Sequence, residues 1–394
     1  MELVFWFCLA LVVYTYLGYP VVLFLLVKLK RLFNRQKLLF FEPSELPRVS
    51  LVVACYNEAE ILEEKIANTL ALSYPDDKLD ICFVTDGSDD NSDEIIAKYA
   101  NIKHFHSDER KGKNAAINRI LPLLKTPYII FCDANTFLNK EALVNLVRHY
   151  KDEKVGAVAG EKRVFSTNED ENAGAGEGAY WKYESQLKKW DSELYSVVGA
   201  AGELFSVKSD LMDPVPDGII IEDFFLSVKI AMNGYKVRYE PEAYAMEAGS
   251  SSIAEERKRK VRISAGGLQA VGLFAGLLNF FKYGTLSFQY ISHRFFRWTV
   301  APLSLLILLL INIYLVVAGA GIVYTVLLAS QVFFYFLAAM GNLYELKGKS
   351  SKVFLIPFYF VFMNVSVYQG FFRLLKGKQS AVWEKSARAK LKKT

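Results

Sequence analysis

The chain has 394 residues, enough for more than one domain. Hydrophobic residues make up 52% and aromatic residues 14%, and the apolar excess gathers at the two ends of the chain, which argues against an ordinary soluble protein. The net charge of +5 is small and comes from local clusters, so no nucleic-acid partner is expected. The four cysteines (Cys8, Cys55, Cys82 and Cys132) form no CxxC pair, which favours a reducing, cytoplasmic compartment over a disulfide framework or a cysteine zinc site.

Residues 1–27 predict an N-terminal transmembrane anchor. The run Leu3–Val27 carries no charge, and about 20 apolar residues suffice to cross a bilayer. It lacks the basic start and small-residue cleavage site of a signal peptide. Basic residues follow at 28, 30, 31, 35 and 37, so the N-terminus is expected outside and the chain from residue 28 onward in the cytoplasm, against the inner membrane.

The second half of the chain predicts about three further transmembrane helices within residues 298–373. They are Trp298–Ala318, Ile322–Met340 and Val353–Phe372. Before them, residues 266–297 predict amphipathic helices on the membrane surface. For Gly266–Phe281 a buried helix of the soluble part is the alternative.

The basic tail, residues 374–394, raises the question of which side of the membrane the chain ends on. One anchor and three later spans would leave this tail outside, although its lysines and arginines favour the cytoplasm. Either one late segment is re-entrant, or residues 266–281 also span, or the tail breaks the rule. A cytoplasmic tail is the favoured reading.

Residues 28–265 predict an α/β domain with a mostly parallel sheet. Short apolar runs alternate with helical patterns, as expected when helices cover a parallel sheet. The expected strands are Val49–Cys55, Leu79–Thr85, Ile102–Phe105, Tyr128–Cys132 and Val155–Ala159, and the expected helices are Glu60–Leu72, Asn91–Tyr99, Lys113–Leu124 and Lys140–Tyr150.

Three of these strands end in polar residues, at Tyr56-Asn57-Glu58, at Asp86 and at Asp133-Ala134-Asn135. Each alone is explained by turn or helix-cap chemistry. Three together on parallel strands indicate a ligand site, because ligands bind at the carboxyl ends of such strands. A dinucleotide fold is disfavoured, because the only G-x-G-x-x-A match, Gly174–Ala179, follows no strand and is interpreted as a loop.

With these residues together, the chain resembles membrane-bound family-2 inverting glycosyltransferases of GT-A fold (Rossmann-like), in the branch that contains polysaccharide synthases. The resemblance covers nearly the whole chain. Its motifs are ACYNE (54–58), TDGSDDNS (85–92), KGKNAAIN (111–118), FCDANT (131–136), EGAYWKYE (177–184), GAAGELF (199–205), IEDFFLS (221–227) and RKVR (259–262).

The resemblance implies a nucleotide-sugar donor, with UDP as the expected nucleotide, and a divalent cation, Mn²⁺ or Mg²⁺, on its diphosphate. Asp133 and Asn135 are the expected metal ligands, and hard cations prefer such oxygen donors. The family usually has Asp-x-Asp here, so Asn135 removes one ligand charge.

The remaining donor contacts follow from the same resemblance. The nucleotide is expected at Tyr56, Asn57, Glu58 and Asp86, and Lys113 near it at a helix start that favours anions. A solvated lysine in a basic turn is the alternative for Lys113.

In IEDFF, Asp223 matches the family's catalytic base, with Glu222 beside it. A carboxylate that deprotonates the acceptor hydroxyl would support a single, inverting displacement. The alternative for these two residues is a pair of acidic residues that favour a helix start.

Arg259 and Arg262 fall where processive relatives carry Gln-x-x-Arg-Trp, and both are expected to bind diphosphate oxygens. Ile263 replaces the tryptophan, which argues against processivity. A basic cluster on anionic lipid is the alternative reading of these arginines. Gly199, Gly202 and Trp181 are expected on the acceptor side, where glycine permits close approach of the backbone and aromatic rings stack on sugars.

The sequence therefore predicts a membrane-bound glycosyltransferase that moves a sugar to a lipid-linked or polysaccharide acceptor in surface glycan synthesis. Membrane lipids are expected partners, and a homo-oligomer or glycan-assembly partners are possible. The alternatives are a processive synthase coupled to export and a non-catalytic membrane protein that binds nucleotide-sugar. A transporter is poorly supported, because the late helices carry almost no charge.

Overall fold

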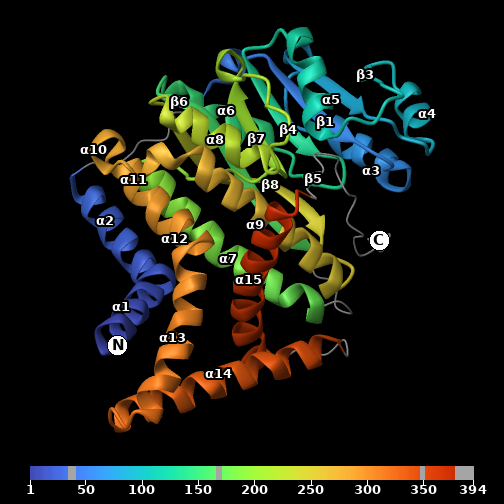
Figure 1. Ribbon diagram of the computed structural model, residues 1–394. Helices are drawn as coiled ribbons and strands as arrows, with labels where there is room; N and C mark the ends of the chain where they lie inside the picture. Colours follow the sequence, from blue (N-terminus) through green and yellow to red (C-terminus); the bar gives the residue numbers. More distant parts are fainter. Residues whose placement is uncertain (34–40, 166–170, 347–350, 378–394) are drawn as a thin grey trace.

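The computed structural model describes residues 1–33, 41–165, 171–346 and 351–377. An α/β layer lies at one end, and long helices extend from it (Figure 1). The sheet has eight strands in the order β3-β2-β1-β4-β7-β6-β8-β5. The strands are β1 Val49–Cys55, β2 Leu79–Thr85, β3 Lys103–Phe105, β4 Tyr128–Asp133, β5 Phe137–Leu138, β6 Val155–Phe165, β7 Leu204–Lys208 and β8 Lys236–Ala248.

The sheet is mixed. Strands β3, β2, β1 and β4 run parallel, as expected, whereas β7 pairs antiparallel with both β4 and β6. Strand β8 is parallel to β6, and the short β5 is antiparallel to β8. The expectation of a mostly parallel sheet therefore holds for the first half of the domain. It missed β5, β7 and β8, which lie in or beside the antiparallel part of the sheet, where the regular alternation of strands and helices is lost.

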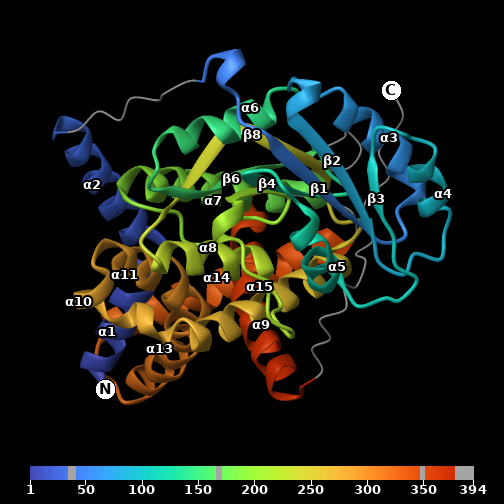
Figure 2. The same cartoon turned by 90° about the horizontal axis from the view of Figure 1, so that it is seen from above.

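Two hydrophobic cores lie on opposite faces of the sheet. Helices α3 (Ala59–Leu70), α4 (Ser92–Ala97) and α6 (Ala142–Val147) cover one face. Helices α5 (Lys113–Ile120) and α8 (Glu222–Met232) cover the other (Figure 2). The alternation of apolar and polar residues in these helices explains their placement, because each buries one stripe against the sheet.

The core formed by α5 and α8 continues into the segment that follows the α/β domain. Helix α9 spans Ile253–Leu273, so the expected boundary at residue 265 falls inside one helix. Four of the buried core residues, Phe274, Leu277, Leu286 and Tyr290, come from α9's C-cap, the following turn and helix α11 (Thr285–Tyr290). Part of the segment 266–281 therefore packs into the core. Phe280 and Phe281 of α10 (Phe280–Tyr283) are exposed.

One sequence interpretation was wrong. Gly174–Ala179 lies within helix α7, Glu171–Leu194, and not in a loop. The glycines and the polar run before them weaken the helical signal locally. The C-terminal half of α7 packs against the anchor helix α2 (Tyr19–Phe33), where Leu187 joins a cluster with Tyr19, Leu23 and Val27.

Four helical stretches are long and apolar enough to cross a membrane: Glu2–Phe33, Val300–Val317, Ile322–Leu346 and Val353–Leu375. The first joins α1 (Glu2–Val13) to α2 through a π-helical turn at Tyr14–Gly18. The others are α13 (Val300–Val317), α14 (Ile322–Leu346) and α15 (Lys352–Leu375), which follow the short α12 (Phe296–Trp298). These four agree with the four spans expected from the sequence.

The helices α13, α14 and α15 form an open arch. Figure 1 shows α13 leading away from the α/β layer, α14 running across the far end and α15 returning. Tyr324 near the start of α14 packs on Phe5 of α1, and Gly341 near its end packs on Phe354 at the start of α15. Gly370, near the end of α15, packs on Ala265 of α9. Both ends of α14 thus lie on the side of the molecule that holds the N-terminus, far from the sheet (Figure 1).

Candidate active site

The three polar strand ends meet at one edge of the sheet. Strands β1, β2 and β4 are neighbours, with Cys55 paired to Thr85 and Ala54 paired to Asp133. Because the strands are parallel and in register, the residues that follow them emerge side by side. This places Tyr56, Asp86 and Asp133 at the same edge of the sheet.

The first two strand-end loops are tied to each other. The Asn57 side chain donates to Asp89 Oδ1 (2.5 Å) and accepts from the Asp89 amide (3.0 Å). Asn57 also holds a positive φ of 53°, a conformation that asparagine tolerates better than most residues. The Glu58 amide donates to Ser92 Oγ, and the Glu58 side chain is buried. Asn57 and Glu58 therefore shape the loop, in addition to any contact with a donor.

Asp86 presents one carboxylate oxygen at this edge of the sheet. Its Oδ2 accepts hydrogen bonds from the amides of Lys111 (3.1 Å) and Gly112 (2.6 Å). Its Oδ1 is buried and has no hydrogen-bond partner among the described residues. A buried acceptor without a donor costs free energy unless a ligand satisfies it. The expected role of Asp86 in binding a nucleoside N–H or hydroxyl fits this geometry.

A small recess lies beside Asp86, between the ends of β1 and β2 and the start of α5. The Arg110 guanidinium stacks over the Tyr56 ring at 3.9 Å from its centroid, forming one wall. The lining residues are Ala54, Cys55, Tyr56, Val84, Asp86, Arg110, Gly112, Lys113 and Ala116.

Lys113 joins two carboxylates that are distant in the sequence. Its Nζ lies 2.7 Å from Asp133 Oδ1 and 2.8 Å from Glu222 Oε1. Burial acts against its charge, but the two carboxylates outweigh this effect and raise the pKa of Lys113. Burial likewise opposes ionisation of Glu222, but Lys113 prevails and lowers the pKa of that carboxyl. Lys113 is therefore a fixed cation inside the site, which argues against a solvated surface lysine.

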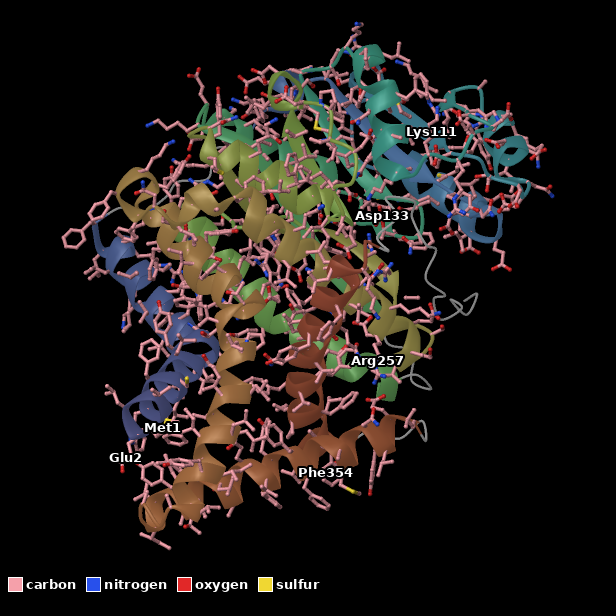
Figure 3. The ribbon with its side chains drawn as sticks, viewed as in Figure 1. Met1, Glu2, Lys111, Asp133, Arg257 and Phe354 are labelled. Atoms are coloured by element: carbon pink, nitrogen blue, oxygen red, sulfur yellow. The ribbon has the colours of Figure 1, made fainter. Side chains whose placement is uncertain are left out.

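Asp223 has the opposite electrostatics. Burial first, and the neighbouring Glu222 second, raise the pKa of Asp223 to about 7. A general base works best when its pKa lies near the working pH, so this carboxyl is poised to accept a proton. Figure 3 shows Asp133, whose side chain meets the same cluster, where the α/β layer faces the helices below.

The two predicted glycines have different functions. A Cβ on Gly202 would lie 3.4 Å from Asp223 Oδ2 and 3.7 Å from Lys113 Nζ, so Gly202 borders the reacting groups. Gly199 has a φ of 97°, and a Cβ there would collide with the Phe224 ring. Gly199 therefore lets the loop pack on α8 and supports the site indirectly.

Trp181 and Arg259 lie in a separate, buried ionic cluster. Arg259 pairs with Glu256 (3.0 Å) and Glu247 (3.4 Å). Lys162 lies over the Trp181 ring and pairs with Glu247. Arg259 is thus engaged by these two glutamates. Arg262 lies closer to the site, because its guanidinium donates to the carbonyl of Ile220 and contributes to the lowered pKa of Glu222.

Glu203 is a residue that the sequence reasoning left out. It follows Gly202 directly and pairs with Lys162 at 2.7 Å. Burial opposes its ionisation, but Lys162 outweighs burial and lowers the pKa of Glu203. Glu203 also contributes to the raised pKa of Asp223. Its position inside the motif GAAGELF is the signal that could have identified it.

The donor set fits a hard divalent cation. Asp133 offers a carboxylate at the end of β4, and Glu222 offers a second one that converges on the same ammonium group. The half-buried Asn135 lies in the turn that follows β4. Oxygen donors of this type suit Mn²⁺ or Mg²⁺, and a bound cation would supply charge neutralisation of a departing diphosphate.

The fold and this site resemble those of family 2 glycosyltransferases. Residues 50–212 match the family Glycosyl transferase family 2, so this part of the chain is a domain of that family. Over nearly the whole chain (95%), the fold matches that of the complete mannosyltransferase PcManGT from Pyrobaculum calidifontis, solved with GDP-Man and Mn2+. The TM-score is 0.70 at 21% sequence identity, which shows a shared GT-A fold.

Curated relatives are poly-beta-1,6-N-acetyl-D-glucosamine synthases. The protein of Staphylococcus aureus strain COL is 30% identical over 233 residues, which cover 57% of this chain and 55% of the relative. The protein of Staphylococcus epidermidis is 28% identical over 245 residues, covering 60% and 58%. The match thus spans little more than half the length of these synthases.

Proposed function

We propose that the protein is a membrane-bound inverting glycosyltransferase that moves a sugar from a nucleotide-sugar, in the first place a UDP-sugar, to a lipid-linked or polysaccharide acceptor. The observation that carries the proposal is the cluster of Asp223, Glu222, Lys113 and Asp133. It combines a base of pKa about 7 with a fixed cation and an oxygen ligand set beside the Asp86 recess.

The chemistry follows from these positions. The acceptor hydroxyl gives its proton to Asp223 while its oxygen attacks the anomeric carbon of the donor. The bond from that carbon to the diphosphate oxygen breaks, and the nucleoside diphosphate leaves. Lys113 is placed to bind the negative charge that develops on the leaving group, and one displacement inverts the anomeric configuration.

The membrane setting is part of the proposal. Lys30 donates to the carbonyls of Glu193 and Leu194, so the basic end of the anchor is fixed to the catalytic domain. The positive-inside rule then favours a cytoplasmic catalytic domain against the inner membrane. Anchor residues 1–27, surface helices 266–297 and the late helices 298–373 would hold the site near a lipid-linked acceptor.

Processive synthesis is a second candidate, favoured by the names of the synthases that the chain matches. Ile263 at the tryptophan position and the engagement of Arg259 with Glu256 argue against it. A non-catalytic nucleotide-sugar-binding partner would not need a base beside the cluster.

The test is nucleotide release by the full chain in membranes or detergent. UDP-N-acetylglucosamine is assayed first, then other UDP- and GDP-sugars, with Mn²⁺ or Mg²⁺ and membrane lipid extract. We expect release from one donor, lost by a factor of about 10² or more in Asp223→Asn and Asp133→Ala. The exposed Asp217→Asn, five residues before α8, is the matched control.

Product length separates the candidates. A single added sugar supports simple transfer, whereas a long polymer from one active chain supports processive synthesis. Donor binding without release by the intact protein, with lipid extract present, would overturn the enzymatic proposal.

A further inference from the structure

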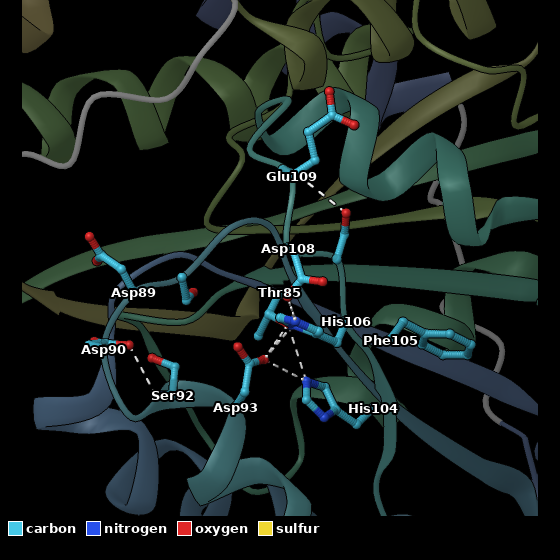
Figure 4. Close-up of polar contacts among 12 residues, drawn as sticks. Thr85, Asp89, Asp90, Ser92, Asp93, His104, Phe105, His106, Asp108 and Glu109 are labelled. Carbon is cyan, nitrogen blue, oxygen red and sulfur yellow. Dashed lines mark hydrogen bonds and ion pairs between the residues drawn. The ribbon is translucent and has the colours of Figure 1, made fainter.

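A second polar cluster lies at the edge of the sheet, outside the groups that carry the proposed reaction. It combines Asp93 of α4, His104 of β3, His106 just after β3, and Thr85, the last residue of β2 (Figure 4). Two of the chain's four histidines meet here at one carboxylate. Their side chains are 19% and 38% exposed and that of Asp93 is 22% exposed, so the cluster can be reached from solvent.

Four potential ligand atoms converge in this cluster. Asp93 Oδ1 lies 3.0 Å from His104 Nε2, 2.9 Å from His106 Nδ1 and 2.5 Å from Thr85 Oγ1. Thr85 Oγ1 lies 3.1 Å from His104 Nε2 and 3.0 Å from His106 Nδ1. Tetrahedral ligands at about 2.0–2.1 Å from zinc lie about 3.3–3.4 Å from one another, so a small outward shift would admit the ion.

The outer contact of His106 favours a ligating tautomer. His106 Nε2 lies 2.9 Å from Asp108 Oδ1, where it can donate its proton. The other nitrogen, Nδ1, then faces Asp93 Oδ1 with a lone pair. A histidine that binds a metal through one ring nitrogen commonly donates its other ring N–H to a carboxylate. Two acceptors that face each other at 2.9 Å need a cation or an extra proton between them.

The kind of donor atom indicates the kind of metal. Two imidazole nitrogens and one carboxylate suit zinc or a neighbouring late first-row ion, whereas Mg²⁺ prefers oxygen ligands. The Asp133 site offers oxygen donors, so the two sites should select different ions.

We propose that Asp93, His104 and His106 bind a zinc-class divalent cation, with Thr85 as a neighbouring oxygen, and that this ion holds the segment 106–112 against the end of β2. The segment matters for the recess beside Asp86. The Gly87 amide donates to the carbonyl of Ser107, and the Lys111 and Gly112 amides donate to Asp86. An ion bound at His106, where the segment 106–112 begins, would fix the position of the Lys111 and Gly112 amides on Asp86. It would also fix Arg110, which lines the recess beside Asp86.

The test uses the full chain without a polyhistidine tag, purified in detergent and stripped with a chelator. Co²⁺ is added as a spectroscopic probe for zinc, in the absence of nucleotide. We expect one nitrogen-ligated, tetrahedral Co²⁺ per chain by its visible absorption, displaced by Zn²⁺, and a rise in Tm with Zn²⁺. His104→Gln and His106→Gln should each weaken Co²⁺ binding by about 10-fold or more and remove the Zn²⁺-dependent rise in Tm.

Two controls make the result specific. His149→Gln removes an imidazole that pairs with Glu240 elsewhere, and Asp133→Ala removes the oxygen ligand of the donor site; both should keep the Co²⁺ absorption. His106 is exposed enough that its substitution should leave the fold intact, which gel filtration checks. Absence of nitrogen-ligated Co²⁺, or binding by both histidine variants as tight as that of the unsubstituted chain, would overturn the proposal, whatever the outcome of the transferase assay.

Discussion

At the scale of single residues, two adjacent carboxyls acquire opposite properties. Lys113 contacts Glu222 and lowers the pKa of that carboxyl, whereas burial and the charge of Glu222 raise the pKa of Asp223. Pairs of titratable groups whose environments separate their pKa values divide roles in this way. Glu222 is therefore suited to hold Lys113 as a fixed negative charge, and Asp223 is suited to accept a proton.

The pH dependence of the reaction follows from Asp223. Its carboxyl must be ionised to accept a proton, so kcat/KM should fall about tenfold per pH unit below a midpoint near pH 7. The measurement is nucleotide release between pH 5 and 9 at low donor concentration. A midpoint near the ordinary value of 3.8 would contradict the effect of burial.

The same shift has a consequence for stability. Because the pKa of Asp223 is higher in the folded state, the unfolded state ionises first, and this group lowers stability as pH rises from about 4 through about 7. Asp223→Asn should therefore lose activity at pH 8 yet melt at the same temperature as the wild type or above it. Thermal unfolding in detergent supplies this control for the activity assays.

At the scale of elements, α9 connects the site to the membrane helices through three glycines. A Cβ on Gly266 would lie 2.9 Å from the Ile221 side chain, next to Glu222. Gly267 faces the Trp298 ring, and Gly370 of α15 lies against Ala265. Glycine allows these close approaches, so the position of α8 depends on α9.

Gly266→Leu should displace Ile221 and with it the start of α8. Misplacement of catalytic groups by about 1 Å can cost about 10²-fold in rate, so we expect kcat/KM to fall by about tenfold or more. Overpacking should also lower the free energy of unfolding by about 1–3 kcal/mol. The control is Gly272→Leu on the same helix, where no described atom lies within 4 Å of a Cβ. Equal activity of the two variants would show that α9 does not position α8.

At the scale of the whole molecule, the arch of α13, α14 and α15 suggests how the basic tail could reach the side of the α/β domain. Four crossings would place the basic tail on the same side as the N-terminus. In the structure α14 runs across the far end, and α15 brings the chain back to α9 on the side of the catalytic domain (Figure 1). We expect α14 to lie along the far side of the membrane, so that the end of α15 returns to the side of the α/β domain, which the positive-inside rule places in the cytoplasm. This arrangement differs from the three sequence alternatives, which were a re-entrant late segment, a further span at residues 266–281 and a tail that breaks the rule.

Thiol labelling tests this topology, since the four native cysteines are buried. Ala320→Cys, in the turn between α13 and α14, should react with a membrane-impermeant reagent in intact cells. Leu375→Cys, at the exposed end of α15, should react only after permeabilisation. Labelling of Leu375→Cys in intact cells would mean that α14 crosses the membrane as well.

The sequence alone determined the elements whose signals are local. Buried apolar runs predicted β1, β2 and β4, and polar residues at their ends pointed to Asp86 and Asp133. Apolar stretches of about 20 residues located the four helices that are long enough to cross a membrane. The ordered motifs predicted Asp223 and Gly202 as site residues, and the structure places the two side by side. Each of these signals depends on residues that are close in the chain.

Only the tertiary structure decided the features that depend on distant residues. Strand β7 inserts antiparallel between β4 and β6, Lys113 joins Asp133 to Glu222, and Arg259 turns toward Glu247. The pKa of Asp223 likewise depends on burial by several elements. Charges, burial and strand order are properties of groups brought together by folding, and a local pattern contains no information about such distances.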